Sequence, residues 1–351
     1  MFVNDNPMPL LIGRGSGMPV CGNLLFDFFS ALPVVAGLMK KEDLLKWPPT
    51  VLFLVLICSL MWGSAFPTLK VGFELLGITQ NTGGKLYFAA YRFLLAGLLL
   101  FAGIRLSGRP IALSRKRDYA VLATVGLLQT TFQYVFFYIG LSNTTALKAS
   151  IITGAGSFFL ALFSHWWMTD DRMTTRKSFG LILGFLGVVL VNFQSGGFDF
   201  RFALTGEGFI LLGTITSVFA ILVVKKFAVR LYPPLMVAYS LTIGAVVLIL
   251  IALACESPSV IQLTTQTTLI MIYLSFVSAA AFSLWYLLVK HNQLSKMAVY
   301  RFLIPVCGTF LSAAILKAES LNWLALTSLA LVASGMILTS LQSNQTIRNP
   351  R

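Results

Sequence analysis

Polar and aromatic side chains at helical spacing inside long apolar runs are the residues of this chain best suited to bind a ligand. Gln129, Gln133 and Tyr138 lie four and five positions apart, so one helix would bring them to about the same face. A second run carries a comparable set: Ser278, Ser283, Trp285 and Tyr286. Amides and hydroxyls in lipid need hydrogen-bond partners, so both sets should point inward, toward a substrate or toward another helix.

Two arginines and one tryptophan stand out by their depth in apolar sequence. Arg92 and Arg301 lie within or near apolar runs, where an ionisable group is costly and is a candidate for function. Each could hold a substrate carboxylate; the alternatives are snorkelling toward water or contacts with backbone carbonyls of another helix. Trp62 lies too deep in its run for an interfacial tryptophan, and we expect it to stack on an organic substrate.

The sequence contains no pattern of residues suited to catalysis or to metal binding. None of the 12 acidic residues falls in the middle of an apolar run, which argues against a carboxylate proton relay. The two histidines lack metal-like spacing, and the four cysteines form no CxxC pair or disulfide framework. No phosphate loop or nucleophile–base arrangement is present. We therefore expect a protein that is not an enzyme and has no catalytic residue, metal or cofactor.

Composition defines the class. Of the 351 residues, 57% are hydrophobic and only 11% charged, against roughly 25% charged in soluble domains. Apolar runs of about 18 or more residues recur, and each is long enough to cross a bilayer core. Such runs must be helical because lipid cannot satisfy backbone amides. The net charge of +14 lies in short loops between the runs, so we expect lipid and a small molecule as partners and no nucleic acid.

The sequence predicts an all-α membrane protein with ten transmembrane helices and short loops. The expected spans are roughly 49–70, 84–104, 118–141, 145–168, 178–194, 206–226, 234–255, 266–289, 297–316 and 321–341. Residues 1–46 differ, because proline and glycine punctuate their start and an apolar stretch at 20–39 holds Asn23, Asp27 and Pro33. We expect a loosely ordered extension there; a peripheral amphipathic helix is the alternative.

Loop charges predict the orientation, since cytoplasmic loops collect lysine and arginine. With the N-terminus inside, the loops expected to be cytoplasmic carry most of the positive charges, and the outer side holds only Lys70, Lys85, Lys148, Arg201 and Lys317. Both termini, including a tail at 343–351, should then be cytoplasmic, and the 196–201 loop should face outward. The expected location is the cytoplasmic membrane of the cell.

The chain also repeats itself. The layout of runs and breaks at 132–191 returns at 280–339 after a shift of 148 positions, which places Tyr138 on Tyr286 and Lys148 on Lys296. Five spans per copy is an odd number, so the second copy enters from the opposite face. We expect two inverted five-helix repeats, at 47–195 and 206–342, with a substrate site between them near mid-membrane.

Several short motifs resemble a known family. These are the residues LMWGSAFP at 60–67, YRF at 91–93 and YIGL at 138–141, together with Pro305 and Glu319. Over about 47–342 the chain resembles a ten-helix member of the drug/metabolite transporter superfamily, in the EamA-domain group. The resemblance implies export or exchange of small metabolites, often amino acids or drugs. It also implies a central cavity lined by the first four helices of each repeat, with the fifth helices peripheral.

Helix breaks at matching positions predict where the halves move. Gly154, Gly156 and Ser157 interrupt the fourth expected span, and Pro305 with Gly308 interrupts the ninth. Ser157 departs from the family pattern, because a proline matching Pro305 is expected there. Tight helix packing without a ligand is the alternative. A small-residue stripe at 180–187 should pack the fifth helix against a neighbour, either in the same chain or in a second subunit of a homodimer.

Together these features predict a secondary transporter that works by alternating access; a receptor or an integral membrane enzyme is the alternative. The halves should rock around a site between the fourth and ninth helices, with walls from the first, third, sixth and eighth. The expected substrate-binding residues are Trp62, Gln129, Gln133, Tyr138, Ser150, Thr153, Ser157, Trp285, Tyr286, Arg301 and Pro305. Without an intramembrane carboxylate, the substrate's own gradient or exchange should supply the energy.

Overall fold

The computed structural model describes residues 41–144, 146–169, 171–192, 203–316 and 323–348, and this part of the chain contains helices and no strand. The α-helices are α2 (Lys41–Leu44), α3 (Pro48–Leu75), α4 (Thr82–Leu106), α5 (Lys116–Gly126), α6 (Gln133–Ser142), α7 (Ala146–Trp167), α8 (Thr175–Asn192), α9 (Phe209–Phe227), α10 (Pro233–Cys255), α11 (Thr265–His291), α12 (Leu294–Tyr300), α13 (Leu303–Leu316) and α14 (Trp323–Arg348). Shorter helical segments are η1 (Leu127–Phe132), η3 (Leu204–Gly208) and η4 (Pro258–Val260).

Seven segments of the described chain are long and apolar enough to cross a membrane. They are Pro48–Leu75, Thr82–Leu106, Lys116–Ser142, Leu204–Phe227, Pro233–Cys255, Thr265–His291 and Leu294–Ile315. Large apolar side chains are exposed on their outer faces, as at Leu250 (60%) and Leu269 (62%). Such surfaces suit lipid better than water. The chain is therefore a multi-pass, all-helical membrane protein, as its composition predicts.

Local sequence explains where the main helices begin. Proline has no backbone N–H and suits the first helical turn, where Pro48 and Pro233 start α3 and α10. The Asn81 side chain accepts a hydrogen bond from the N–H of Gly84 at 2.7 Å and so caps α4. Thr264 and Thr267 form a capping box at the start of α11. These caps set the ends of helices that line the interior.

Three expected spans are irregular. The π-helical η3 begins the one expected at 206–226, and the other two irregularities lie beside the interior of the protein. The span expected at 118–141 consists of α5, the π-helical η1 and α6, and the N–H of Gln133 bonds to the carbonyl of Leu128 five residues earlier. π-Helical turns often mark functional sites. The span expected at 297–316 breaks between α12 and α13 at Arg301 and Phe302. Pro305 explains this break, because its ring clashes with the carbonyl four residues before it.

The expected interruption of the fourth span is wrong, since α7 runs without a break from Ala146 to Trp167. Glycine keeps its backbone N–H, so Gly154 and Gly156 leave the hydrogen-bond ladder intact. They admit close neighbours instead: a side chain at Gly154 would meet Val188, and one at Gly156 would meet Thr214. The helix therefore packs tightly at this point rather than bending.

Near both ends of the chain, helices reach into segments that the sequence predicts to be an extension and a tail. Within the expected extension at 1–46, residues 1–40 lie outside the described residues, and the short helix α2 follows them. The side chain of Asn292 donates a hydrogen bond of 3.0 Å to the carbonyl of Leu45, which holds this segment against the end of α11. At the other end, α14 continues to Arg348 and so enters the segment expected as a tail.

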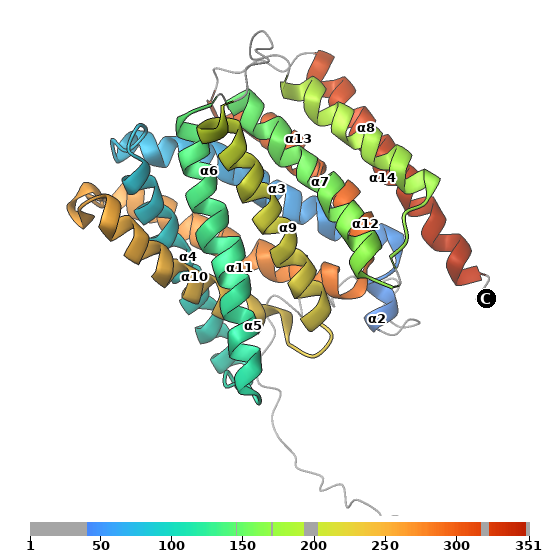
Figure 1. Ribbon diagram of the computed structural model, residues 1–351, viewed down its shortest axis with the longest axis horizontal. Coiled ribbons are helices and arrows are strands. Elements are labelled where there is room, and N and C mark those ends of the chain that lie inside the picture. Colours follow the sequence, from blue (N-terminus) through green and yellow to red (C-terminus); the bar gives the residue numbers. More distant parts are fainter. Residues whose placement is uncertain (1–40, 145, 170, 193–202, 317–322, 349–351) are drawn as a thin grey trace, which may run out of the picture.

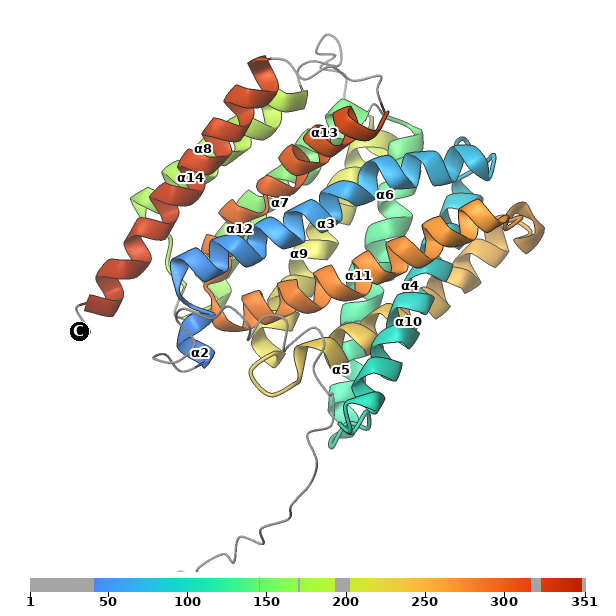
Figure 2. The same cartoon turned by 180° about the vertical axis from the view of Figure 1, so that it is seen from behind.

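Helices from the two halves of the chain pack in close pairs. α8 and α14 lie side by side along one edge, and α4 and α10 lie side by side away from that edge (Figures 1 and 2). Figure 2 shows α3 and α11 next to each other on the face turned toward the viewer. α3 also packs on α13, and α9 packs on both α6 and α7. The core therefore lies between the halves.

Glycines allow close contact between α10 and α5 and between α14 and α8. A Cβ atom on Gly244 of α10 would lie 2.5 Å from the backbone oxygen of Gly126 in α5, and one on Gly126 would lie 2.5 Å from the backbone oxygen of Ser240. A Cβ atom on Gly335 of α14 would lie 2.6 Å from the backbone oxygen of Gly180 in α8. The small-residue stripe at 180–187, which lies in α8, thus packs on α14 of the same chain.

A buried ion pair ties the beginning of α8 to α12. The Nζ atom of Lys177 lies 3.1 Å from Oδ1 of Asp171, and the two side chains are 6% and 4% exposed. Asp171 also accepts hydrogen bonds from Ser295, through its backbone N–H at 2.8 Å and through its hydroxyl. Lys177 additionally donates to the side-chain oxygen of Gln293 at 2.9 Å. This network connects the two halves through hydrogen bonds between a charged pair of the first half and neutral groups of the second.

Candidate functional site

A cavity of about 200 Å³ lies among helices from both halves of the chain. Its lining residues come from α3, α4, the η1–α6 segment, α9, α11, the break between α12 and α13, and α13 itself. They are Trp62, Ala65, Phe66, Leu69, Arg92, Gln129, Gln133, Tyr134, Ser217, Ile221, Val277, Ser278, Phe282, Trp285, Arg301 and Ile304. Most are apolar or aromatic, with a few polar groups among them, which is the composition of a small-molecule site.

Arg92 brings a guanidinium group to this cavity from inside α4. It is 4% exposed, and its Nη2 atom donates a hydrogen bond of 3.4 Å to the hydroxyl of Tyr134. The guanidinium also lies 4.3 Å from the ring centre of Phe93, an arrangement that favours a cation. Its buried Nε atom has no hydrogen-bond partner among the described residues. The group is held in position and keeps a free donor.

Arg301 reaches the same cavity from the opposite half of the chain. It lies at the break between α12 and α13, where Pro305 interrupts the helix. Its Nη1 atom is buried and has no hydrogen-bond partner in the described part of the chain. The break therefore places an arginine of the second half in the cavity. The Nη1 atom of this arginine has no acceptor among the described side chains.

Three aromatic residues form an apolar wall. The ring of Trp62 lies 5.2 Å from that of Phe282 and 5.6 Å from that of Trp285, in edge-to-face geometry. Trp62 comes from α3, and the other two come from α11. Because α3 and α11 pack together, residues distant in sequence make one surface on which a flat apolar group could lie.

The amides of the cavity are set by the π-helical segment. Gln129 lies within η1 and Gln133 follows it directly, and both line the cavity. The hydroxyl of Tyr286 donates a hydrogen bond to Oε1 of Gln129 at 2.5 Å. This bond uses one of the two lone pairs of Oε1 and fixes the orientation of the Gln129 amide. Tyr286 supports the site from behind and is not itself one of the lining residues.

The structure brings together five of the residues predicted from the sequence: Trp62, Gln129, Gln133, Trp285 and Arg301 line the cavity. The other predicted residues lie elsewhere in the fold. Tyr138 is buried against the rings of Phe73, Tyr134 and Phe137.

Three of the predicted residues of the fourth and ninth spans, Thr153, Ser157 and Pro305, are not among the lining residues of the cavity. Thr153 is exposed on α7 and donates a hydrogen bond to the carbonyl of Ala149. Ser157 is buried in the same helix. The side chain of Ser150 lies outside the described residues. Pro305 is half-buried, and its contribution is the helix break beside Arg301.

Sequence reasoning left several lining residues out of the predicted set. Arg92 had a usable signal, because it is an ionisable residue deep in an apolar run. Ser278 belongs to the polar set of the eighth span. Tyr134, Ser217 and Phe282 had no such signal, because single aromatic or hydroxyl residues are common in membrane helices and only the packing brings these three to the cavity.

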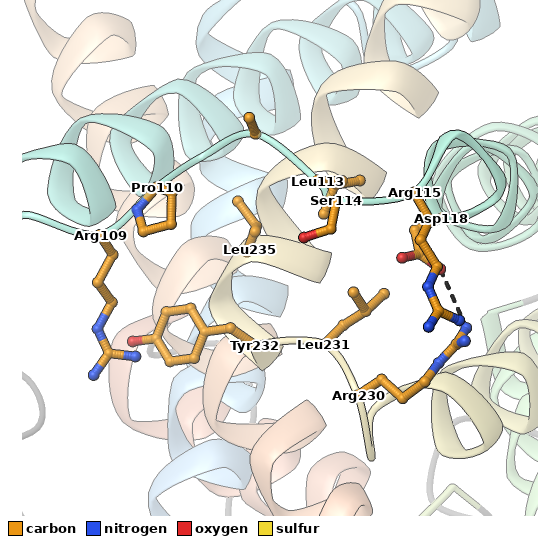
Figure 3. Close-up of a pocket in the computed structure, with 11 residues that line it drawn as sticks. Arg109, Pro110, Leu113, Ser114, Arg115, Asp118, Arg230, Leu231, Tyr232 and Leu235 are labelled. Carbon is orange, nitrogen blue, oxygen red and sulfur yellow. Dashed lines mark hydrogen bonds and ion pairs between the residues drawn. The ribbon is translucent and has the colours of Figure 1, made fainter. Parts of the chain in front are cut away.

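A second hollow, of about 510 Å³, lies between the α4–α5 loop and the α9–α10 loop (Figure 3). The guanidinium of Arg109 lies 4.5 Å from the ring centre of Tyr232 on one side of it. On the other side, Arg230 donates to Asp118 at 3.1 Å, as the dashed line shows. Its arginines are exposed and near the protein surface. The central cavity, enclosed by both halves, is therefore the better candidate for a substrate site.

An all-helical membrane fold around a cavity lined by both halves defines a polytopic membrane protein with an internal small-molecule site. The sequence pattern of the EamA-like transporter family matches this chain twice, over residues 49–193 and 204–341. The chain therefore belongs to the EamA-like transporter family and is a membrane transporter.

Individual relatives agree with this assignment. The chain is 30% identical to the "Uncharacterized transporter YvbV" of Bacillus subtilis, over 81% of this chain and 89% of that protein. It is 25% identical to a "Probable amino-acid metabolite efflux pump" of Salmonella typhimurium, over 81% of this chain and 92% of that protein. A solved crystal structure shares the fold with a TM-score of 0.69 at 18% identity, covering 84% of this chain and 99% of the other.

Proposed function

We propose that this protein is a secondary transporter that moves a small organic metabolite, amino acid or drug across the cytoplasmic membrane by alternating access, in export or exchange. The observation that carries the proposal is the central cavity, because α3, α4 and η1 supply one part of its wall and α9, α11 and α13 supply the other. A site shared by two halves changes its access when one half moves against the other. A similar protein of Salmonella typhimurium bears the name of an efflux pump.

In this proposal the chain has ten spans in two inverted repeats, 47–195 and 206–342. The packing of the helices supports it. α4 packs on α10 and α8 on α14, which pairs the second span with the seventh and the fifth with the tenth. α3 packs on α13 while α9 packs on α7, so the contact of the first span with the ninth has its counterpart between the sixth and the fourth. A two-fold axis in the membrane plane produces such pairs.

Both termini are cytoplasmic in this proposal, and cysteine labelling tests the orientation. In a background where Cys21 and Cys255 are serine, Ser259→Cys in the α10–α11 connection should react with an impermeant maleimide added to intact cells. Ser114→Cys, in the α4–α5 loop, should react only after the membrane is opened. The reverse pattern would contradict the proposed topology and with it the inverted repeats.

Transport itself is tested in proteoliposomes loaded with isotopically labelled amino acids and aromatic acids, with efflux followed by mass spectrometry. A matched pair of variants ties any flux to the cavity. Ser217→Trp should fill the cavity and abolish the flux, whereas Leu250→Trp, on a surface that is 60% exposed, should leave it unchanged. Absence of flux for every labelled compound, or equal flux in both variants, would contradict the proposed function.

A further inference from the structure

The central cavity has two positively charged side chains, and none of its described lining residues carries a carboxylate. Arg92 and Arg301 both line it, and none of its other described lining residues is an aspartate or glutamate. Buried charge is costly unless it is paired. The Nε atom of Arg92 and the Nη1 atom of Arg301 are both buried and have no partner among the described residues. The site therefore lacks an anion that would match its own charges.

The neutral polar groups of the cavity also include a hydrogen-bond donor without an acceptor. The indole Nε1 of Trp285 is buried and has no hydrogen-bond acceptor within the described chain. Oε1 of Gln129 already accepts a hydrogen bond from Tyr286, which leaves its amide N–H groups as donors. The buried lining atoms without a partner, on Arg92, Arg301 and Trp285, are thus all donors, and a ligand that brings hydrogen-bond acceptors would satisfy them.

We propose that the substrate is a small organic anion, whose carboxylate binds between Arg92 and Arg301 and whose apolar body lies on the wall formed by Trp62, Phe282 and Trp285. This inference rests on the proposed transport function and specifies its substrate class. The planar guanidinium group matches a carboxylate with two parallel hydrogen bonds, which makes arginine better suited to this role than lysine. The aromatic wall accounts for selection of an organic acid over an inorganic anion.

The positions of the arginines also favour exchange as the mode of transport. Arg92 belongs to the first half of the chain and Arg301 to the second. In the empty protein, two like charges in a region of low dielectric repel each other and oppose closure of one half on the other. A carboxylate between them removes this repulsion. Reorientation is then favoured for the loaded protein, which is the requirement for exchange of one anion for another.

Four probes that share a phenyl group and differ in their polar end test the substrate class. These are 3-phenylpropionate, 3-phenylpropanamide, phenylalanine and 2-phenylethylamine, titrated at pH 7 against the purified protein by isothermal calorimetry. We expect 3-phenylpropionate to bind at least about tenfold more tightly than its neutral amide, because a hydrogen bond to a charged group contributes more than a neutral one. The cationic amine should bind most weakly.

Charge-removing variants locate the effect at the two arginines. Arg92→Gln and Arg301→Gln should each weaken 3-phenylpropionate binding at least about tenfold and leave the amide nearly unchanged, so the amide also reports that the variant is folded. Arg92→Lys and Arg301→Lys keep the charge but lose the planar fork and should be intermediate. Arg105→Gln, exposed near the end of α4, is the matched control and should bind like the parent protein.

Several outcomes would overturn the proposal: equal affinity for the acid and its amide, tighter binding of the amine, no binding of any probe, or unchanged acid binding in both glutamine variants. Flux of the same probes in proteoliposomes separates this inference from the proposed function. Selective binding of the acid without any flux would contradict transport and support the anion site. Flux at equal rates for acid and amide would support transport and contradict the anion site.

Discussion

Tyr286 in α11 donates a hydrogen bond to Oε1 of Gln129 in η1 with an O···O distance of 2.5 Å, although the two residues lie 157 positions apart. Both side chains are buried, with 2% and 6% of their surfaces exposed. The bond connects the second half of the chain to the π-helical segment of the first. It also fixes the orientation of the Gln129 amide.

Tyr286→Phe should lower the free energy of unfolding by about 1–3 kcal/mol, because it leaves the buried Oε1 atom of Gln129 without its donor. A double-mutant cycle with Gln129→Leu measures the interaction itself, by thermal unfolding of the purified protein. We expect a coupling energy of about 1 kcal/mol between the two substitutions. Strictly additive effects would show that the hydrogen bond contributes nothing to stability.

Pro305→Ala should slow transport more than it weakens binding. The alanine N–H can bond to the carbonyl of Arg301, which at present accepts a bond of 3.1 Å from the N–H of Ile304. The hydrogen-bond ladder would then continue across the break between α12 and α13 and stiffen this span. Turnover and affinity are measured separately, in proteoliposomes and by calorimetry.

The control for this prediction is Pro110→Ala, which removes a proline from the α4–α5 loop, outside every helix. It should leave both quantities unchanged. If Pro305→Ala reduced affinity and turnover by the same factor, the break would act on the placement of Arg301 and not on movement of the helix.

Asp171→Asn should lower the free energy of unfolding by about 3–5 kcal/mol, since it leaves the buried charge of Lys177 without its carboxylate. Asp118→Asn is the matched comparison. Its partner Arg230 is 43% exposed, and water screens that pair, so the loss should be about 1 kcal/mol or less. Thermal unfolding of both variants in the same detergent decides the point. Similar losses would mean that burial of the Lys177 pair does not determine its contribution.

Glu256, in the loop after α10, gives a prediction for pH. Hydrogen bonds from the side chain of Asn81 at 2.8 Å and from the N–H of Ser257 hold the pKa of this carboxyl below its usual range. Because the pKa is lowered in the folded protein, the ionised carboxylate adds stability at pH values above the ordinary pKa of about 4.3. This stability is lost as the pH falls through the pKa of the folded protein.

The measurement is the unfolding temperature between pH 7 and pH 3.5. Glu256→Gln should flatten its decline below about pH 4.3, and Asn81→Ala should flatten it in part because it removes the main donor. Glu74→Gln, on the exposed face of α3, is the control and should follow the parent protein. An unchanged acid profile in Glu256→Gln would rule out this carboxyl as a source of the pH dependence.

The sequence predicts the elements of this fold well and its irregular points less well. Long apolar runs identify the helices because lipid leaves the backbone no other solution. Pro305 correctly indicates a break in the ninth span, since it lacks an N–H. Gly154 and Gly156 wrongly indicate a break in α7, because glycine permits a bend or a close contact equally and only the neighbouring helix decides. The π-helical turn at η1 leaves no such signal.

The candidate site likewise contains residues that the sequence can reveal and residues that it cannot. Trp62 and Arg301 can be found from their depth in apolar sequence, where a polar or amphipathic side chain needs a reason. Phe282 cannot, because phenylalanine facing lipid and phenylalanine facing a cavity have the same sequence context. The shift of 148 positions places Tyr138 on Tyr286, yet of these two hydroxyls it is that of Tyr286 that hydrogen-bonds to a lining residue within the described part of the chain.

The glycine contacts between helices limit how this sequence can change over evolution. At Gly244 and at Gly335, the atoms that a new side chain would meet include a backbone oxygen, of Gly126 and of Gly180 respectively. No substitution in the opposite helix can remove a backbone atom. A change to alanine at either position therefore cannot be rescued by a smaller residue across the contact. Such a lineage could recover only by reversion or by moving whole helices apart, so these positions should be among the slowest to drift.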